Sequence, residues 1–103
     1  MSYASIQIDF DAACAQAARL EGIAEQIRTL ANVRMKDTVA QMSASWKGDS
    51  AAAYFAKAEK LQGDIAKTAN NLDRIAGTIR ATARRIYEAE QAALRLAEQR
   101  SGH

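Results

Sequence analysis

The sequence predicts an all-α protein, a helical hairpin of two long antiparallel helices, and three observations favour this fold class. Proline is absent from the 103 residues, and only five glycines interrupt the chain. Hydrophobic residues make up 49% of the sequence, but many of them are alanine, the strongest helix former. Apolar residues also recur at steps of three and four positions on either side of one central cluster of loop-forming residues.

The first helix is expected to extend from about residue 9 to residue 43. Asp9 is expected to cap its start and Asp11 to lie in its first turn, because carboxylates favour the positive end of the helix dipole. Its apolar stripe is typical of an amphipathic helix and consists of Phe10, Ala13, Ala17, Leu20, Ile23, Ile27 and Leu30. We attribute the later drift of the stripe to the 3.6-residue turn of a straight helix; the drifting members are Ala31, Met35, Val39 and Met42.

The turn between the helices is expected at residues 44–49, where serine, glycine and aspartate cluster. Gly48 can adopt a positive φ without steric cost. Trp46 can lay a large ring across the ends of both helices and so close the hairpin. Trp46 and Gly48 therefore form the predicted turn motif.

The second helix is expected over residues 50–100, with Asp49 or Ser50 as its cap and residues 101–103 as a short tail. Its apolar stripe keeps a seven-residue period and consists of Ala58, Leu61, Ile65, Thr68, Leu72, Ile75, Ile79, Thr82, Ile86, Ala89, Ala93 and Leu96. Such a heptad seam requires a partner helix.

A hairpin of this length is expected to leave apolar surface uncovered, because a rod of two helices buries less surface than a rounder domain. A second apolar strip is available at the neighbouring pairs Ile23–Ala24, Tyr54–Phe55 and Ile75–Ala76. We therefore expect the single domain, residues 1–103, to dimerise into a four-helix bundle. The residues expected in the hairpin and dimer seams are Leu20, Ile23, Ile27, Leu30, Leu61, Ile65, Leu72, Ile75, Ile79 and Ile86.

Composition and motifs argue against several other classes of function. The net charge is only +2, which gives no strong field for nucleic acid or membranes. Cys14 is the single cysteine and His103 the single histidine, so neither a metal site nor a cofactor is expected. No phosphate-binding glycine loop or nucleophile motif occurs, so we expect no enzyme activity. The N-terminus lacks the features of a Sec signal peptide, and no apolar stretch approaches the roughly 20 residues of a membrane span.

The triplet Trp46-Lys47-Gly48 lies mid-chain between two amphipathic helices and is followed by Ala51, Ala52 and Phe55. In these residues, in its length and in its helix–turn–helix pattern, the chain resembles the WXG-hundred family, the early-secreted-antigen type of small type VII secretion protein. The resemblance implies a helical hairpin that forms homodimers, or heterodimers with a paralogue, as antiparallel four-helix bundles. It also implies secretion from the cytoplasm in folded form by a non-Sec route, whose membrane motor is an FtsK/SpoIIIE-like ATPase.

Members of this family often carry an export signal, a tyrosine followed four residues later by an acidic residue. The resemblance places Tyr87 at this tyrosine, but the residue four positions on is Gln91, with Glu88 and Glu90 nearby. Either Gln91 or Glu90 takes the place of the acid, or a partner supplies the signal. The recognition face expected around Tyr87 also includes Arg84. The alternative is an ordinary solvated face beside the seam.

The preferred interpretation is a secreted, non-enzymatic interaction protein that works as a homodimer. Two variants stay open: a heterodimer with a paralogue, or a chaperone-like targeting adaptor for a larger, co-secreted toxin. A basic helical nucleic-acid-binding protein is a second hypothesis, motivated by Arg80, Arg84, Arg85 and Arg95. A third is a membrane-active amphipathic hairpin, which requires the apolar faces to open.

Overall fold

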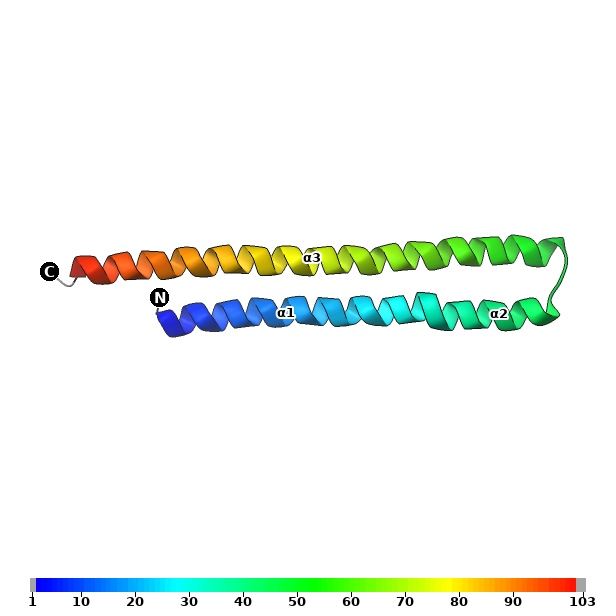
Figure 1. Ribbon diagram of the computed structural model, residues 1–103, viewed down its shortest axis with the longest axis horizontal. Helices are drawn as coiled ribbons and strands as arrows, with labels where there is room; N and C mark the ends of the chain where they lie inside the picture. Colours follow the sequence, from blue (N-terminus) through cyan, green and yellow to red (C-terminus); the bar gives the residue numbers. More distant parts are fainter. Residues whose placement is uncertain (1, 102–103) are drawn as a thin grey trace. The chain divides into compact units, whose positions relative to one another are not determined.

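A computed structural model describes residues 2–101 of the chain. Its helical segments are α1 (Tyr3–Thr29), the π-helical segment η1 (Leu30–Met35), α2 (Lys36–Ser45) and α3 (Asp49–Ser101) (Figure 1). No strand occurs within residues 2–101, and the predicted all-α class is confirmed. None of the helices in this part of the chain is both long enough and apolar enough to cross a membrane. The expected tail beyond Ser101, which includes His103, lies outside the described residues.

The first helix begins at Tyr3, earlier than the expected start near Asp9. Two serines explain the difference, because each accepts a hydrogen bond from the backbone of the other. The Ser5 N–H donates to Ser2 Oγ, and the Ser2 N–H donates to Ser5 Oγ, both at 3.1 Å. This reciprocal pair satisfies backbone donors at the helix start in the manner of a capping box. Asp9 and Asp11 are therefore exposed residues in the interior of α1 rather than at its start.

Contacts between helices divide the chain into two compact units. The first unit pairs residues 3–20 of α1 with residues 74–101 of α3, and the two segments are antiparallel (Figure 1). The second unit, residues 21–73, is a helical hairpin in which the first part of α3 returns beside the end of α1, η1 and α2. Each unit is thus an antiparallel helix pair, which confirms the predicted hairpin arrangement.

Small residues line the seam between the paired helices. The buried residues are Ala24, Ala31, Ala51 and Ala69 in the second unit and Ile6, Ala17 and Ala76 in the first, each at most 2% exposed. The distance between helix axes depends on the size of the side chains at the contact. Alanine at these positions therefore lets the paired helices approach closely.

The large residues expected in the seams form two groups. One group is half-buried and consists of Leu20, Ile27, Ile65, Leu72 and Ile79. The other group is 44–53% exposed and consists of Ile23, Leu30, Leu61, Ile75 and Ile86. At the neighbouring pairs Ile23–Ala24 and Ile75–Ala76, the alanine occupies the buried position and the isoleucine lies outside. The residues of the exposed group are therefore only partly covered by the paired helix of the same chain.

One turn of π-helix, η1, separates α1 from α2. The seam passes through Ala31 and continues at the half-buried residues Met35, Val39 and Met42. A π-turn accommodates one more residue than an α-helical turn. Across this segment Met35 stays half-buried while Arg34 is exposed. The shift of the stripe therefore coincides with a local π-turn, and the gradual rotation of a straight helix stays a prediction.

Candidate functional site

The turn brings three aromatic rings into contact. After α2 ends at Ser45, Trp46 takes an extended conformation, with φ −112° and ψ 113°. Its ring centroid lies 5.3 Å from that of Tyr54 and 5.7 Å from that of Phe55. Both pairs are tilted or edge-on, as aromatic pairs prefer. Trp46 thus packs against the early turns of α3, while 38% of its surface stays exposed.

Gly48 gives the turn its backbone geometry. Among residues 2–101 it is the one residue with a positive φ, 108°, a conformation that a residue with a Cβ adopts only at a cost. Its carbonyl accepts a hydrogen bond from the Ala52 N–H at 3.0 Å, at the start of α3. Asp49 is the first residue of α3 and places a carboxylate at the positive end of the helix dipole.

An apolar flank lies beside the alanine seam in the second unit. Ile23 and Leu30 directly precede the buried residues Ala24 and Ala31 on α1 and η1. Because the paired helices run in opposite directions, the position before a seam residue lies on the same side of the pair in both helices. On α3 of this unit the position is held by Leu61, which precedes the half-buried Gln62. We call these three residues, Ile23, Leu30 and Leu61, the apolar flank.

A mainly apolar groove in the first unit has a volume of about 370 Å³. Its walls include Phe10, Ile79 and the exposed Ile86. The charged residues that line it are both acidic, Asp9 from α1 and Glu90 from α3. We call it the acidic groove.

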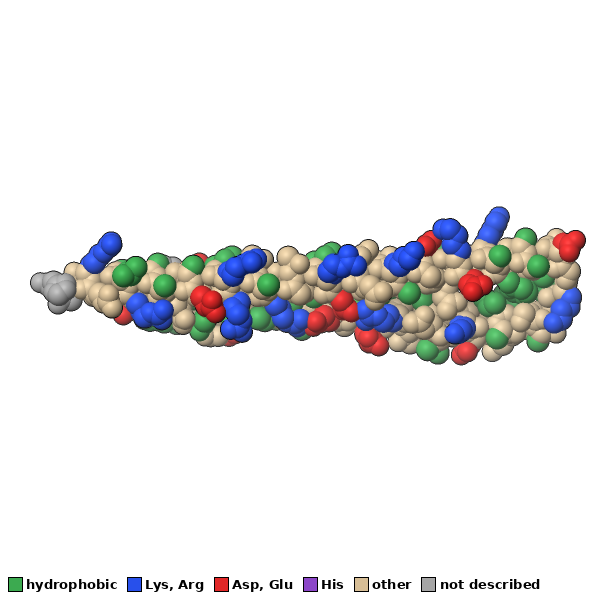
Figure 2. Space-filling model, turned by 45° about the horizontal axis from the view of Figure 1, so that its top comes forward, with side chains coloured by type: hydrophobic (Ala, Val, Ile, Leu, Met, Phe, Trp, Pro, Cys, Tyr) green, Lys and Arg blue, Asp and Glu red, His purple; other side chains and the backbone are tan. Residues whose placement is uncertain are grey.

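A second groove, in the second unit, has a volume of about 420 Å³. Hydrophobic side chains gather near the turn (Figure 2), and those that line this groove are Leu30, Met35, Val39, Met42, Tyr54 and Leu61. Its charged lining residues are both basic, Arg34 from η1 and Lys57 from α3. We call it the basic groove. Within residues 2–101, none of the four groove charges forms a side-chain hydrogen bond or an ion pair.

The other side of the second unit is polar, and its charges are paired. Arg28 and Asp73 directly follow seam residues, and the two form an ion pair between α1 and α3. Arg28 also pairs with Glu25 at 3.3 Å and donates to Asn70 Oδ1 at 3.0 Å. The hydrogen bond to Asp73 and the nearby carboxylates raise the pKa of Arg28 above its ordinary value. This cluster bridges the two helices and helps to fix their register.

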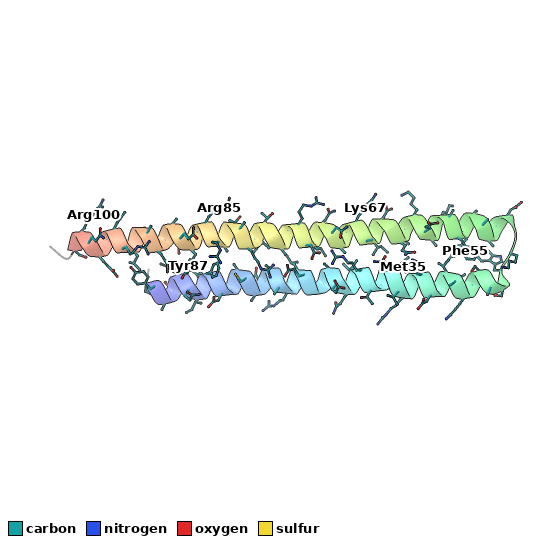
Figure 3. All side chains as sticks on the ribbon, in the orientation of Figure 1. Met35, Phe55, Lys67, Arg85, Tyr87 and Arg100 are labelled. Carbon is teal, nitrogen blue, oxygen red and sulfur yellow. The ribbon has the colours of Figure 1, made fainter. Side chains whose placement is uncertain are left out.

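Tyr87, half-buried in the first unit, is the central residue of a chain of side-chain hydrogen bonds. Its ring centroid is 4.8 Å from that of Phe10 on α1, and its side chain points toward the paired helix (Figure 3). Its hydroxyl donates to Gln7 Oε1 at 3.0 Å and accepts from Gln91 Nε2 at 2.9 Å. Gln7 donates in turn to Asp11 Oδ1 at 2.9 Å. The phenol is therefore held by both helices.

The other residues of the expected recognition face are only partly brought together. Gln91 contacts the Tyr87 hydroxyl, and Arg84 lies 5.5 Å from the centroid of the Phe10 ring, within cation–π distance. Glu88 is exposed, and Glu90 lines the acidic groove. Gln91 is therefore the residue of this face that forms a hydrogen bond with the Tyr87 hydroxyl, and whether Gln91 or Glu90 replaces the acid of the export signal stays a prediction.

A further contact joins the start of α1 to the last turns of α3. The Tyr3 hydroxyl donates to Glu98 Oε2 at 3.3 Å. Partial desolvation and the negative charge of Glu98 raise the pKa of Tyr3 above its ordinary value, because both disfavour the phenolate.

Comparison with known protein families matches residues 5–91 to WXG100, described as proteins of 100 residues with WXG. The match spans α1, η1, α2, the turn with Trp46 and Gly48, and most of α3. The chain belongs to the WXG100 family. Comparisons with curated proteins and with solved structures give no match.

Membership of the WXG100 family indicates a small protein associated with type VII secretion. It gives no positive indication of catalysis. In the part of this WXG100 protein that the structure describes, no three His, Cys, Asp or Glu side chains are grouped so that they could hold a metal ion.

Gln7, Arg34 and Lys57 of this WXG100 protein were not predicted as functional residues, and Asp9 was predicted as a helix cap. The predicted antiparallel pairing places the start of α1 beside the later part of α3. This pairing could have indicated that a residue near the start of α1, such as Gln7, contacts Tyr87. The groove residues gave no comparable signal. Charged residues on amphipathic helices are usually solvated, and the π-turn that places Arg34 beside a groove is not apparent from spacing alone.

Proposed function

We propose that this WXG100 protein is a substrate of a type VII secretion system and acts by pairing with a second copy of itself rather than by catalysis. The observation that carries the proposal is the family match over residues 5–91. The protein starts in the cytoplasm and leaves by a non-Sec route, and the membrane partner is the FtsK/SpoIIIE-like ATPase of that system. A co-secreted toxin is a further partner for the pair.

The exposed apolar residues support the pairing. Ile23, Leu30 and Leu61 of the apolar flank are 44–53% exposed, and Leu30 and Leu61 line the mainly apolar basic groove. Contiguous apolar surface on a water-soluble protein marks an interaction site. A second helix pair packed on this side removes that surface from water and completes a four-helix bundle.

Light scattering on the purified protein tests the pairing. We expect twice the 11.2 kDa mass of one chain. Leu61→Arg places a charge on the apolar flank and should weaken association about tenfold or more. Ile8→Arg is the matched control, because Ile8 is 66% exposed and lines neither groove. A monomeric wild-type chain that associates only with a WXG-type paralogue would identify the heterodimer or adaptor instead.

The export signal is tested separately in the native host. Tyr87→Ala removes both the ring beside Phe10 and the hydroxyl that joins Gln7 and Gln91. We expect the variant to accumulate in cells and to be missing from the medium, while its dimer persists. Tyr87→Phe keeps the ring and tests the hydroxyl, and Tyr3→Ala is the control for loss of a tyrosine. Normal export of Tyr87→Ala would remove Tyr87 from the signal.

A further inference from the structure

The acidic groove lies within the first unit and places negative charge beside Tyr87. Its lining includes Tyr87 and two acids, the half-buried Glu90 from α3 and the exposed Asp9 from α1. Gln91, which occupies the position of the acid in the export motif, does not line this groove. Its amide instead donates a hydrogen bond to the Tyr87 hydroxyl at 2.9 Å. The negative charges that border the groove beside Tyr87 therefore come from two helices.

The other acids of the first unit are placed differently. Asp11 and Glu98 each accept a hydrogen bond from another side chain, and Glu88 lies outside the groove. Within residues 2–101, neither Asp9 nor Glu90 forms a side-chain hydrogen bond or an ion pair. Both groove carboxylates are therefore available to a partner.

We propose that the acidic groove is the docking site for a basic segment of the secretion machinery that carries one large apolar side chain. The inference rests on the proposed function and specifies the surface through which the machinery recognises the protein. The apolar side chain lies against Phe10, Ile79 and Ile86, and the basic residues beside it pair with Asp9 and Glu90. Asp9 of α1 thereby belongs to a recognition surface whose tyrosine lies on α3.

Charge and size select this occupant. Both charged residues that line the groove are acidic, so they favour a partner with lysine or arginine and disfavour nucleic acids and anionic lipids. The volume of about 370 Å³ is near the lower end of the range of ligand pockets, roughly 300–1,000 Å³. A groove of this size accommodates one or two anchoring side chains, whereas the pairing of two helical hairpins requires a longer face. Ile86 is 53% exposed, so its apolar surface is available to such an anchor.

Binding of a defined peptide tests the chemistry of the groove. The basic peptide has one leucine flanked on each side by two lysines, and two matched peptides replace the leucine by glycine or the lysines by glutamates. The NMR resonances of the protein are followed at low ionic strength, where surface charges are least screened. We expect the basic peptide to shift the resonances of Phe10, Ile79 and Ile86. Both matched peptides should bind about tenfold more weakly or worse, because each lacks one half of the recognition.

Neutral variants of the protein separate the contributions of the two acids. Asp9→Asn and Glu90→Gln each remove one charge and keep the size of the side chain. Each should weaken binding of the basic peptide about two- to fivefold, as expected for the loss of one partly exposed ion pair. Circular dichroism checks the fold of each variant, and light scattering checks its self-association.

The matched control removes the same number of charges outside the groove. It combines Asp37→Asn with Glu88→Gln, and both side chains are exposed and line neither groove. The control should bind the basic peptide like the wild type.

Export from the native host tests the same surface in its biological setting. We expect the secreted amount to fall about fivefold or more in the double variant Asp9→Asn with Glu90→Gln, which still folds and dimerises. Asp9→Asn alone should reduce export about two- to fivefold, although a signal confined to α3 would not require this residue. The control with Asp37→Asn and Glu88→Gln should be exported normally.

The outcomes separate this inference from the proposed function. Export of the wild type that persists after deletion of the type VII ATPase overturns the proposed function itself. If the wild type needs that ATPase and the double variant is exported normally, only the docking at the groove is overturned. Equal binding of the basic and the acidic peptide overturns it as well. Weaker self-association of the folded double variant would identify a second copy as the occupant and overturn the proposal.

Discussion

At the scale of single residues, one residue of the turn acts through its backbone conformation and another through its side chain. Gly48 supplies a φ of 108°, and Trp46 supplies the ring that contacts Tyr54 and Phe55. The ring is 38% exposed, so its removal should cost less than the roughly 3–5 kcal/mol typical of a fully buried tryptophan. The glycine is required for its conformation alone, because a Cβ built at Gly48 meets no atom within 4 Å.

Gly48→Ala should therefore destabilise the protein by about 1–2 kcal/mol through backbone strain, without any clash. Gly63→Ala and Gly77→Ala are matched controls, since both glycines lie inside α3 and a Cβ there also meets nothing within 4 Å. Each control should stabilise by up to about 1 kcal/mol, because alanine is the better helix former. Urea unfolding followed by circular dichroism measures all three. Equal effects at the three positions would contradict the role of the positive φ.

The contact between Tyr3 and Glu98 predicts a titration. The pKa of Tyr3 is raised in the folded chain, so its stabilising effect is present below the ordinary tyrosine pKa of about 10 and is lost as the pH rises through the folded value. Glu98→Gln should lower the pKa of Tyr3, because it removes the negative charge beside the phenol. The ring resonances of Tyr3, followed by NMR during alkaline titration, report this change. An unchanged midpoint would remove Glu98 as a cause.

At the scale of helices, the π-turn η1 sets the register between α1 and α2. It allows Ala31 and Met35 to lie four residues apart in sequence where the heptad pattern requires three. The residues that follow, Val39 and Met42, then keep the regular spacing. The extra residue is accommodated without placing Arg34 in the seam.

Deletion of Val33, which is 50% exposed within η1, should convert the π-turn to regular α-helix and leave the seam intact. We expect its free energy of unfolding to stay within about 1 kcal/mol of the wild type, because surface changes away from packed features are usually small. Deletion of Gln16, in the regular part of α1, should cost about 3 kcal/mol or more, since Ile6 and Phe10 leave their contacts. Thermal unfolding compares the two. A severe loss of stability in the Val33 deletion would contradict the register argument.

The helices themselves could be predicted from periodicity, and the choice of buried face could not. Ile23 and Ala24, like Ile75 and Ala76, form neighbouring apolar pairs, so either member can be assigned to the seam. Sequence reasoning favours the larger residue because it buries more area. A short distance between the helices favours the smaller residue. Because Ala24 and Ala76 are the buried members of their pairs, close packing of the helices outweighs the larger area that isoleucine would bury.

The contact between Tyr87 and Gln91 could be predicted from the sequence, because it depends only on spacing within one helix. Tyr87 and Gln91 lie one helical turn apart and are joined by a hydrogen bond. The partner from α1, Gln7, lies 80 positions away in the sequence, and only the antiparallel register brings it to the phenol. The helix start at Tyr3 was missed because a serine-to-serine cap was outweighed by the carboxylates of Asp9 and Asp11.

At the scale of the whole molecule, alanine seams and exposed aliphatic residues couple stability to association. Alanine buries little apolar area, so the seams contribute less hydrophobic stabilisation than leucine seams would. The larger residues Leu30, Leu61 and Ile75 contribute fully only when a partner covers them. A folded state that binds a partner gains stability as the partner concentration rises.

The melting temperature should therefore depend on protein concentration. A hundredfold increase in the concentration of a paired chain is worth about 2.7 kcal/mol of stability and should raise the melting temperature by about 5–10 °C. Differential scanning calorimetry across this range measures the shift, and Leu61→Arg should reduce it. The prediction is contradicted by a transition temperature that is the same at every concentration.

The extra residue held by η1 has an evolutionary consequence. A helix that accommodates an inserted residue in one wider turn keeps the buried positions before and after that turn on the same face. The insertion then leaves the packing unchanged, so selection for packing does not remove it. Homologues that differ by a one-residue gap opposite Leu30–Met35 would be equivalent in architecture, and gaps at other places in the same helix would be selected against.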